Sequence, residues 1–520
     1  MYYFYLQKLI LKLKLFVSNF IEMPSKLTPS ELEIIEEAYG ILKQESPFFN
    51  NLITTYAIKP YSPAWDLACF LTYAHFSHIK SLEFAWNEFW EKRSTNRVYR
   101  NLQYRVPYSY IPLIADNNFN KLAYKLLELN RLDIYVLDWN VFFSIFFDYC
   151  SKTLPTLSKR EFSLFLAALQ CQSLKSNDLL KHLEIDSSNL SKYKKRLMEK
   201  GIVYQGISLN YPRLNLAVYG VYLESSKSLS EAILKEIPNS PFLHSIFQSY
   251  LGNNKLLIQY VAPAIPEVSR DLLRLVQNLE SNFQIADSLI LSFKNATRLT
   301  SFNYSIYDIQ SKEWNLESYD IRMHFSFYDQ IRDKQAFFVK QLQTNNLGYK
   351  INLNKEGIEI LNHILYNNHL TIKQIANNLK YSERTVKNHI KNLEDSNIYS
   401  HKINPSYIFS LTNIVLFLRN SDDKQLEYHN KFSILPEVYS EQFLTDNKSG
   451  YYFVLRVPPD LVLEAIDILE EDFSENILKI FVVNQMYSKR WSIPMDKYET
   501  LFQEWKYTPE DVLGDMVIQA

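Results

Sequence analysis

Glycine is scarce in this sequence, with 9 residues in 520, about 1.7% where roughly 7% is usual. A backbone loop that wraps a phosphate needs glycines at fixed spacing, and neither GxGxxG nor GxxxxGK[ST] occurs. The sequence also lacks a nucleophile elbow, a cofactor fingerprint and a paired acid–base signature. We therefore expect no enzymatic activity, no catalytic residues and no cofactor.

Cysteine and histidine are too dispersed to suggest a metal site. The three cysteines, Cys69, Cys150 and Cys171, are far apart and in no CxxC spacing, which is typical of buried thiols in a reducing compartment. The ten histidines include no HExxH motif and no zinc-type Cys/His cluster. These absences predict a cytoplasmic protein without a bound metal.

Long uninterrupted apolar runs are missing as well. Residues 1–21 are strongly apolar, but Lys8, Lys12 and Lys14 interrupt them before the ~18–20 residues that a spanning helix requires. Three interpretations of this predicted helical segment (1–56) stay open: a false start ahead of Met23, a helix docked on the protein, or an amphipathic helix on a membrane. We do not expect a membrane partner, because no other run is long enough to cross a bilayer.

The charge balance limits how the chain can bind nucleic acid. Hydrophobic residues make up 47% and charged residues 22%, and the net charge is −1. These are globular values, and the length predicts several domains. Because the whole chain is not a polycation, any nucleic-acid binding must come from local basic patches.

An internal duplication organises the chain. At an offset of 196 residues, Lys159–Tyr204 aligns without a gap over Lys355–Ser400, with apolar positions matched at helical spacing. Each copy predicts three short helices and then a strand, which is a winged helix-turn-helix at 157–213 and at 351–410. In the second copy Thr371 and Gln374 have capping-box spacing and Ser382 is placed to cap the third helix.

The segments after each winged unit share a second pattern. They predict strands and helices in the order βαββαβ, the ferredoxin-like split pattern, at 214–298 and 411–490. The clearest predicted strands and helices are 214–224, 253–263, 266–281, 286–293, 412–420 and 459–473. A looser copy at 57–151 is predicted as a degenerate ferredoxin-like domain, 299–350 as a connector with a helix near Tyr328–Gln343, and 491–520 as a C-terminal tail. The expected fold class is therefore α+β and multidomain, with winged helix-turn-helix domains alternating with ferredoxin-like domains.

A winged helix-turn-helix followed by βαββαβ resembles the Lrp/AsnC (leucine-responsive, feast/famine) transcription regulators. The residues that carry the resemblance are Leu174–Lys200 and Leu370–Asp395, followed by the strands 214–224 and 412–420. It implies DNA binding by the third helices and sheet domains that oligomerise or bind a small-molecule effector. The family usually has one winged unit and one sheet domain per chain, whereas this chain has two and three.

The third helix of each winged unit carries the candidate DNA-binding residues. A helix in the major groove needs short polar side chains for base edges and Lys or Arg for phosphates. From 186 to 200 there are five basic and two acidic residues, and from 382 to 396 three of each. The predicted DNA-binding residues are Ser188, Asn189, Ser191, Lys192, Lys195, Arg196, Arg384, Thr385, Lys387, Asn388 and Lys391.

Two functions remain open from the sequence. The first is a regulator of transcription that binds double-stranded DNA, in which the duplication makes one chain a covalent pseudo-dimer and the first sheet domain is free to form a homodimer. The alternative is a protein–protein interaction scaffold whose winged helices are degenerate and whose outward charges are merely solvated. Apolar strands of the predicted kind are also available for dimerisation.

Overall fold

The computed structural model forms two compact units, one of residues 1–155, 199–201 and 489–492 and the other of the remaining chain. The structure describes residues 47–58, 68, 127, 157–183, 187–199, 202–225, 240–249, 255–293, 298–331, 340–342, 353–366, 371–405, 409, 411–419, 424–445, 449–490 and 493–513. In the first unit it describes α3 (Pro47–Thr55), which buries Phe49, Leu52 and Ile53. The predicted segment before α3, and the predicted degenerate sheet domain apart from residues 57, 58, 68 and 127, lie outside the described residues.

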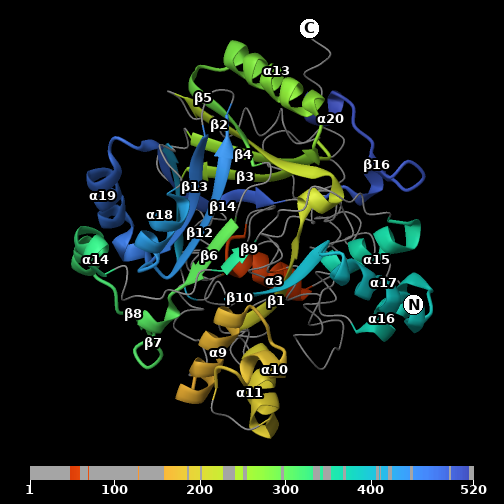
Figure 1. The fold of residues 1–520 in the computed structure, drawn as a ribbon, viewed down its shortest axis with the longest axis horizontal. Coiled ribbons are helices and arrows are strands. Elements are labelled where there is room, and N and C mark those ends of the chain that lie inside the picture. The colour runs from red at the N-terminus through yellow and green to blue at the C-terminus, as the bar shows by residue number, and fades with distance from the viewer. Residues whose placement is uncertain are drawn as a thin grey trace. The chain divides into compact units, whose positions relative to one another are not determined.

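The second unit contains two groups of three helices (Figure 1). The first group is α9 (Lys159–Cys171), α10 (Ser176–Leu179) and α11 (Ser187–Glu199). The second group is α15 (Lys355–Tyr366), α16 (Ile372–Leu379) and α17 (Glu383–Asp395). Both predicted winged units therefore contain three helices where the apolar spacing placed them.

Local capping fixes where several of these helices begin. Thr371 Oγ1 accepts a hydrogen bond from the Gln374 amide and the Gln374 side chain accepts one from the Thr371 amide, the capping box that the sequence predicted. Ser382 caps α17 as predicted, accepting from the Thr385 amide at 3.0 Å. The pair Ser158 and Glu161 makes a further capping box at α9.

The strand that follows each helix group pairs with the strand of the other group. β1 (Val203–Leu209) and β10 (Tyr399–Pro405) form an antiparallel two-stranded ribbon with Gly206 opposite Lys402 at its centre. The sequence predicted a strand after each third helix, but it did not predict that the two strands would be each other's partners. In consequence the two helix groups share one ribbon.

The first sheet half follows β1. Its strands lie in the antiparallel order β3-β4-β2-β5. The elements of this half are β2 (Leu216–Ser225), β3 (Leu243–Ser249), β4 (Lys255–Pro263), α13 (Pro266–Asn282) and β5 (Ile285–Ser292). Residues of the predicted helix between β2 and β3 lie outside the described part of the chain.

The second sheet half follows β10 and has the equivalent strand order, β12-β13-β11-β14. Its elements are β11 (Thr412–Arg419), α18 (Gln425–Phe432), β12 (Glu437–Leu444), β13 (Ser449–Val457), α19 (Val462–Phe473) and β14 (Ile477–Arg490). The predicted strands at 214–224, 253–263, 286–293 and 412–420 and the predicted helices at 266–281 and 459–473 are confirmed to within three residues at each end.

The two halves join at both edges. β5 pairs with β12 and β14 pairs with β3, so eight strands form a closed ring, while β6 (Arg298–Phe302) and β9 (Lys340–Leu342) extend the sheet beyond β12. The closure is narrow on one side, because β5 meets β12 through the pair Ser292 and Leu444, while Glu437–Glu441 of β12 pair with β6. The fold is thus a mixture of helix and sheet, in line with the expected α+β class.

Alternation along the strands fills both faces of the ring. On β11 the residues Ile414, Leu416 and Leu418 pack under α14, α18 and α19 in one apolar cluster. The residues between them face the other side, where Phe417 contacts Tyr222 and Tyr452. Residues 414–418 of β11 are buried on both faces, and all five of them are apolar. Aromatic rings from both halves therefore fill the space where the halves meet.

A short hairpin and a helix follow each sheet half. After β6 come β7 (Tyr307–Asp308), β8 (Glu313–Trp314) and α14 (Ser318–Ile331), and after β14 come β15 (Tyr498–Glu499), β16 (Glu504–Trp505) and α20 (Glu510–Leu513). Short 3-10 helices lie at Tyr211–Leu214, Tyr304–Ile306, Pro459–Leu461 and Met495–Lys497. The indole of Trp314 donates to the Phe409 carbonyl just before β11, and the indole of Trp505 donates to the Leu214 carbonyl just before β2.

The predicted position of the helix in the connector was wrong. The helix expected near Tyr328–Gln343 is α14, which begins ten residues earlier at Ser318. Its start follows from a local contact, because the Asp320 carboxylate accepts from the Glu317 amide at 2.9 Å. Its position follows from packing, because Ile321 and Phe325 belong to the apolar cluster under α18 and α19.

A buried histidine should make this fold sensitive to acid. His429 on α18 has no exposed surface, its Nδ1 lies 2.8 Å from Ser440 Oγ, and burial lowers its pKa to about 3. Because the unfolded side chain has a pKa near 6.5, protonation below that pH favours the unfolded state. We expect the free energy of unfolding to fall by about 2 kcal/mol between pH 7 and pH 5 through this residue alone.

Chemical denaturation at several pH values measures this effect. The His429→Gln variant, which cannot protonate, should lose about that much of the pH dependence, whereas His182→Gln at an exposed position should keep it. Equal pH dependence in the wild type and His429→Gln would contradict the prediction.

Candidate nucleic-acid interface

The third helix of the second group, α17, presents a basic face to solvent. Val386 and Leu393 are buried against α15 and α16, which sets the opposite side of the helix outward. On that side Arg384, Lys387 and Lys391 are exposed at spacings of three and four residues. No acidic residue lies between Arg384 and Lys391, so the face is uniformly basic over two turns.

The polar residues on this helix differ in how available they are. Asn388 is exposed beside Lys387 and Lys391. Thr385 is only partly exposed, and its Oγ1 lies 2.8 Å from the Oγ of the capping Ser382. Asn388 is thus the better placed of the two to meet a base edge, since Thr385 is tied to the helix cap.

Two contacts with α15 hold α17 in place. His389 Nε2 lies 3.1 Å from Glu356 Oε2, and the side chain of His389 is mostly buried. Tyr381, in the turn before α17, donates to Glu359, and that hydrogen bond raises the pKa of the phenol to about 12. Such contacts fix the direction of α17 relative to α15, which a helix that enters a groove requires.

The third helix of the first group, α11, is more mixed. Ser191, Lys192 and Lys195 are exposed and Asn189 is partly buried. Arg196 is 48% exposed but lies 3.9 Å from Glu161 Oε1, a carboxylate that is buried in the α9 capping box. Arg196 therefore also forms an ion pair within its own helix group. The side chain of Ser188 lies outside the described residues.

Sequence reasoning missed one feature of α11. Lys194 is partly buried and lines a pocket together with Lys175 and His401, none of which was among the predicted DNA-binding residues. The signal was present in the 196-residue offset, because Lys194 aligns with the apolar Ile390. A lysine at a position that is apolar in the other copy is a reason to look for a site.

The described residues contain no group of three or more His, Cys, Asp or Glu side chains that could hold a metal ion. Within the same part of the chain, no helix combines the length and the apolarity that crossing a membrane needs.

Residues 355–398 match the family of winged helix-turn-helix DNA-binding domains. The second helix group, from the start of α15 to the end of α17, therefore lies in a winged helix-turn-helix DNA-binding domain. A comparison with curated proteins found no match.

Two solved structures are similar to this chain. One is a crystal structure of the siroheme decarboxylase NirDL in complex with an iron-uroporphyrin III analogue, which is 15% identical in sequence and has a TM-score of 0.33. The match covers 62% of this chain and 90% of the NirDL chain. A second crystal structure of the siroheme decarboxylase NirDL is 14% identical in sequence and has a TM-score of 0.33. The match covers 68% of this chain and 96% of the NirDL chain.

Proposed function

We propose that this protein is a transcription regulator that binds double-stranded DNA through both helix groups and has no enzymatic activity. The observation that carries the proposal is the exposed face of Arg384, Lys387, Asn388 and Lys391 on the third helix of the matched domain. Lysine and arginine on that face suit phosphates, and Asn388 suits an adenine edge. We place the protein in the cytoplasm, where a DNA-binding regulator of this kind meets its target.

In this proposal the chain is an internally duplicated, Lrp/AsnC-like pseudo-dimer. The first residues of β1 and β10 are 196 positions apart in the sequence, and so are the first residues of β2 and β11. The two sheet halves have equivalent strand orders of the ferredoxin-like kind. We infer the domain division 157–213, 214–298, 299–350, 351–410 and 411–490 from this alternation.

Reciprocal contacts support the pseudo-dimer. A two-fold interface repeats each contact with the partners exchanged. Here β5 of the first half joins β12 of the second and β14 of the second joins β3 of the first. Trp314 and Trp505 likewise each donate to the segment that precedes the other copy's first sheet strand. One chain would then present two third helices as two subunits do in a dimeric regulator.

Footprinting of the full-length protein on genomic fragments, combined with a measurement of protein-to-DNA stoichiometry, tests the proposal. Because α11 and α17 carry different residues, we expect one chain to protect an imperfect, asymmetric repeat rather than a palindrome. Protection of a symmetric palindrome by two chains would refute the pseudo-dimer. An absence of protection on any fragment, with retention of protein partners, would favour the interaction scaffold.

A thermal-shift screen addresses the sheet domains, which we propose serve oligomerisation or effector sensing. Because rings such as Phe417, Tyr222 and Tyr452 fill the space between the sheet halves, an effector there would have to displace aromatic side chains.

A further inference from the structure

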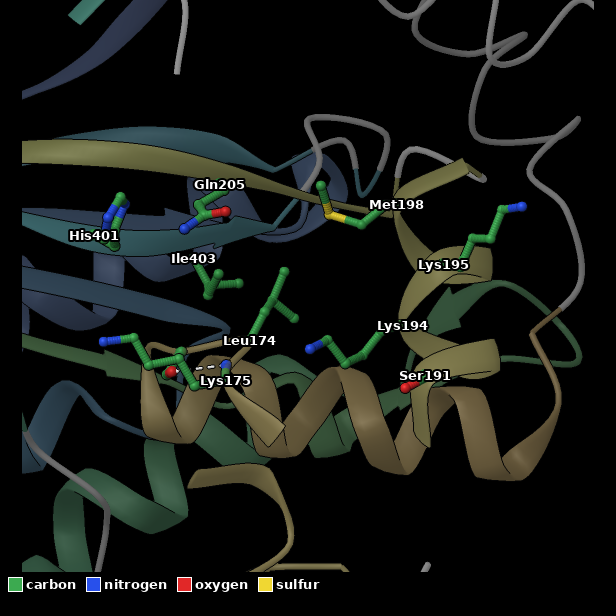
Figure 2. A pocket seen from close by; sticks show the side chains of 10 residues that line it. Leu174, Lys175, Ser191, Lys194, Lys195, Met198, Gln205, His401 and Ile403 are labelled. Carbon is green, nitrogen blue, oxygen red and sulfur yellow. Dashed lines mark hydrogen bonds between the residues drawn. The ribbon is translucent and has the colours of Figure 1, made fainter. Parts of the chain in front are cut away.

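The first helix group contains a pocket of about 540 Å³ between the segment that joins α9 to α10, helix α11 and the β1–β10 ribbon. Leu174, Met198 and Ile403 give it apolar walls, and Gln205 and His401 line it from the ribbon. Figure 2 shows Lys194 directed toward Leu174, whereas the side chains of Lys175 and Lys195 end at opposite sides of the view. One ammonium group therefore enters an otherwise largely apolar space.

Lys194 is poorly satisfied where it lies. It is partly buried, and its described contact is with Ser176 Oγ at 3.5 Å, the outer limit of a hydrogen bond. No carboxylate among the described residues pairs with it, although a charge removed from water is normally paired. Glu394, which lies 3.2 Å from His401 Nε2, also accepts a hydrogen bond from Tyr399. The pocket thus holds a positive charge that lacks a negative partner.

The second helix group shows a different side chain at the position of Lys194. There Ile390 takes the place of Lys194, and Ile390 and Ile207 pack against the apolar cluster around Ile364 and Val386. Ile403, the counterpart of Ile207, lies instead on the wall of the pocket in the first group. The same position is therefore apolar in the second group and carries a charged side chain in the first.

His401 adds a second polar side chain to the lining of the pocket. Its Nε2 lies 3.2 Å from Glu394 Oε1, but its Nδ1 is buried and makes no hydrogen bond. His401 comes from the ribbon and Lys194 from α11, so two separate elements supply polar groups to the same cavity.

We propose that this pocket binds an organic anion that has one acidic headgroup, a carboxylate or a phosphate monoester, and an apolar body. Lys194 pairs with the headgroup while Leu174, Met198 and Ile403 contact the body. A free amino acid does not fit, because no carboxylate lines the pocket to receive its ammonium group. The site goes beyond the proposed DNA binding and does not depend on it.

Fluorescence titration with anilinonaphthalene sulfonate, an aromatic monoanion, tests the pocket in the full-length protein without DNA. We expect the Lys194→Ile and Lys194→Met variants to raise the Kd for this probe about tenfold or more, since a paired charge contributes about 1.4 kcal/mol. Lys159→Met, which removes the same charge from an exposed position on α9, should leave the Kd unchanged. The uncharged phenylnaphthylamine should bind all four proteins equally.

Displacement of the probe identifies the headgroup. Octanoate or octyl phosphate should displace it, and whichever does so at lower concentration is the preferred headgroup; leucine should not displace it. Displacement by leucine, failure of both anions, or equal probe affinity in the wild type and both Lys194 variants would overturn the proposal.

Competition with DNA distinguishes a pocket that binds a small organic anion from a site that binds a phosphate of the DNA backbone. Ser191 and Lys195 line the pocket and are also predicted DNA contacts, so a bound anion should weaken DNA binding if the proposed function holds. If Lys194→Ile weakens DNA binding and the probe binds neither the wild type nor this variant, the pocket binds a DNA phosphate and the proposed site for an organic anion is refuted. If the probe binds as predicted but DNA does not bind at all, only the proposed function fails.

Discussion

Simultaneous replacement of Arg384, Lys387 and Lys391 by alanine is expected to weaken DNA binding about 100-fold at 0.15 M salt. Each phosphate contact contributes a slope of about 0.9 to the dependence of log K on log salt, which at that salt is about fivefold in affinity. Removing all three side chains therefore lowers the affinity by about two orders of magnitude and the salt slope by about three. Fluorescence anisotropy with labelled duplex DNA at several salt concentrations measures both quantities.

The matched control is Lys355→Ala. Lys355 has a side chain that is 82% exposed and lies near Glu359 in the same helix group, but it is on α15 rather than on α17. We expect its salt slope to equal that of the wild type. A triple variant with an unchanged slope would show that the exposed face of α17 does not contact phosphate, which would remove the observation on which the proposed function rests.

The second large effect is expected at the junction of the two sheet halves. Phe417 on β11 is fully buried and its ring lies 5.3 Å from that of Tyr452 and 6.1 Å from that of Tyr222 on the other half. Truncating a buried phenylalanine removes its packing against these rings and leaves a cavity, at a cost of about 3–5 kcal/mol. We expect Phe417→Ala to lower the free energy of unfolding by that amount.

Chemical denaturation followed by circular dichroism measures the change. Leu463→Ala on α19 is the control, because Leu463 is 65% exposed and its truncation should cost less than about 0.5 kcal/mol. A similar small loss for Phe417→Ala would mean that the interior of the ring relaxes around the missing side chain, so that the two halves are held together by strand pairing alone.

Local signals in the sequence determined the helix groups and much of their surface. The capping residues Thr371 and Ser382 mark helix starts through contacts within three residues. The 3.6-residue period then decides which side of α17 is outward, because Val386 and Leu393 must be buried. The spacing of Arg384, Lys387 and Lys391 is therefore enough to place them together on one exposed face.

Strand partners could not be obtained in the same way. Alternation along a strand shows which residues are buried, but it does not identify the neighbouring strand. The apolar run of β11 indicated burial on both faces, yet only the tertiary structure showed that one face meets α18 and α19 and the other meets Tyr222 of the first sheet half. The pairing of β1 with β10 and the pairing of β5 with β12 likewise could be seen only in the tertiary structure.

The sequence by itself determined most helices and strands of the two copies, the caps at Thr371 and Ser382 and the basic face of α17, because each depends on residues a few positions apart, whereas it misplaced α14. Tertiary structure alone decided what depends on residues far apart. Trp505 meets the Leu214 carbonyl across 291 residues of chain, and the wall around Lys194 includes Ile403 from the other copy. Contacts at such separation are set by the packing of whole elements, which no local pattern records.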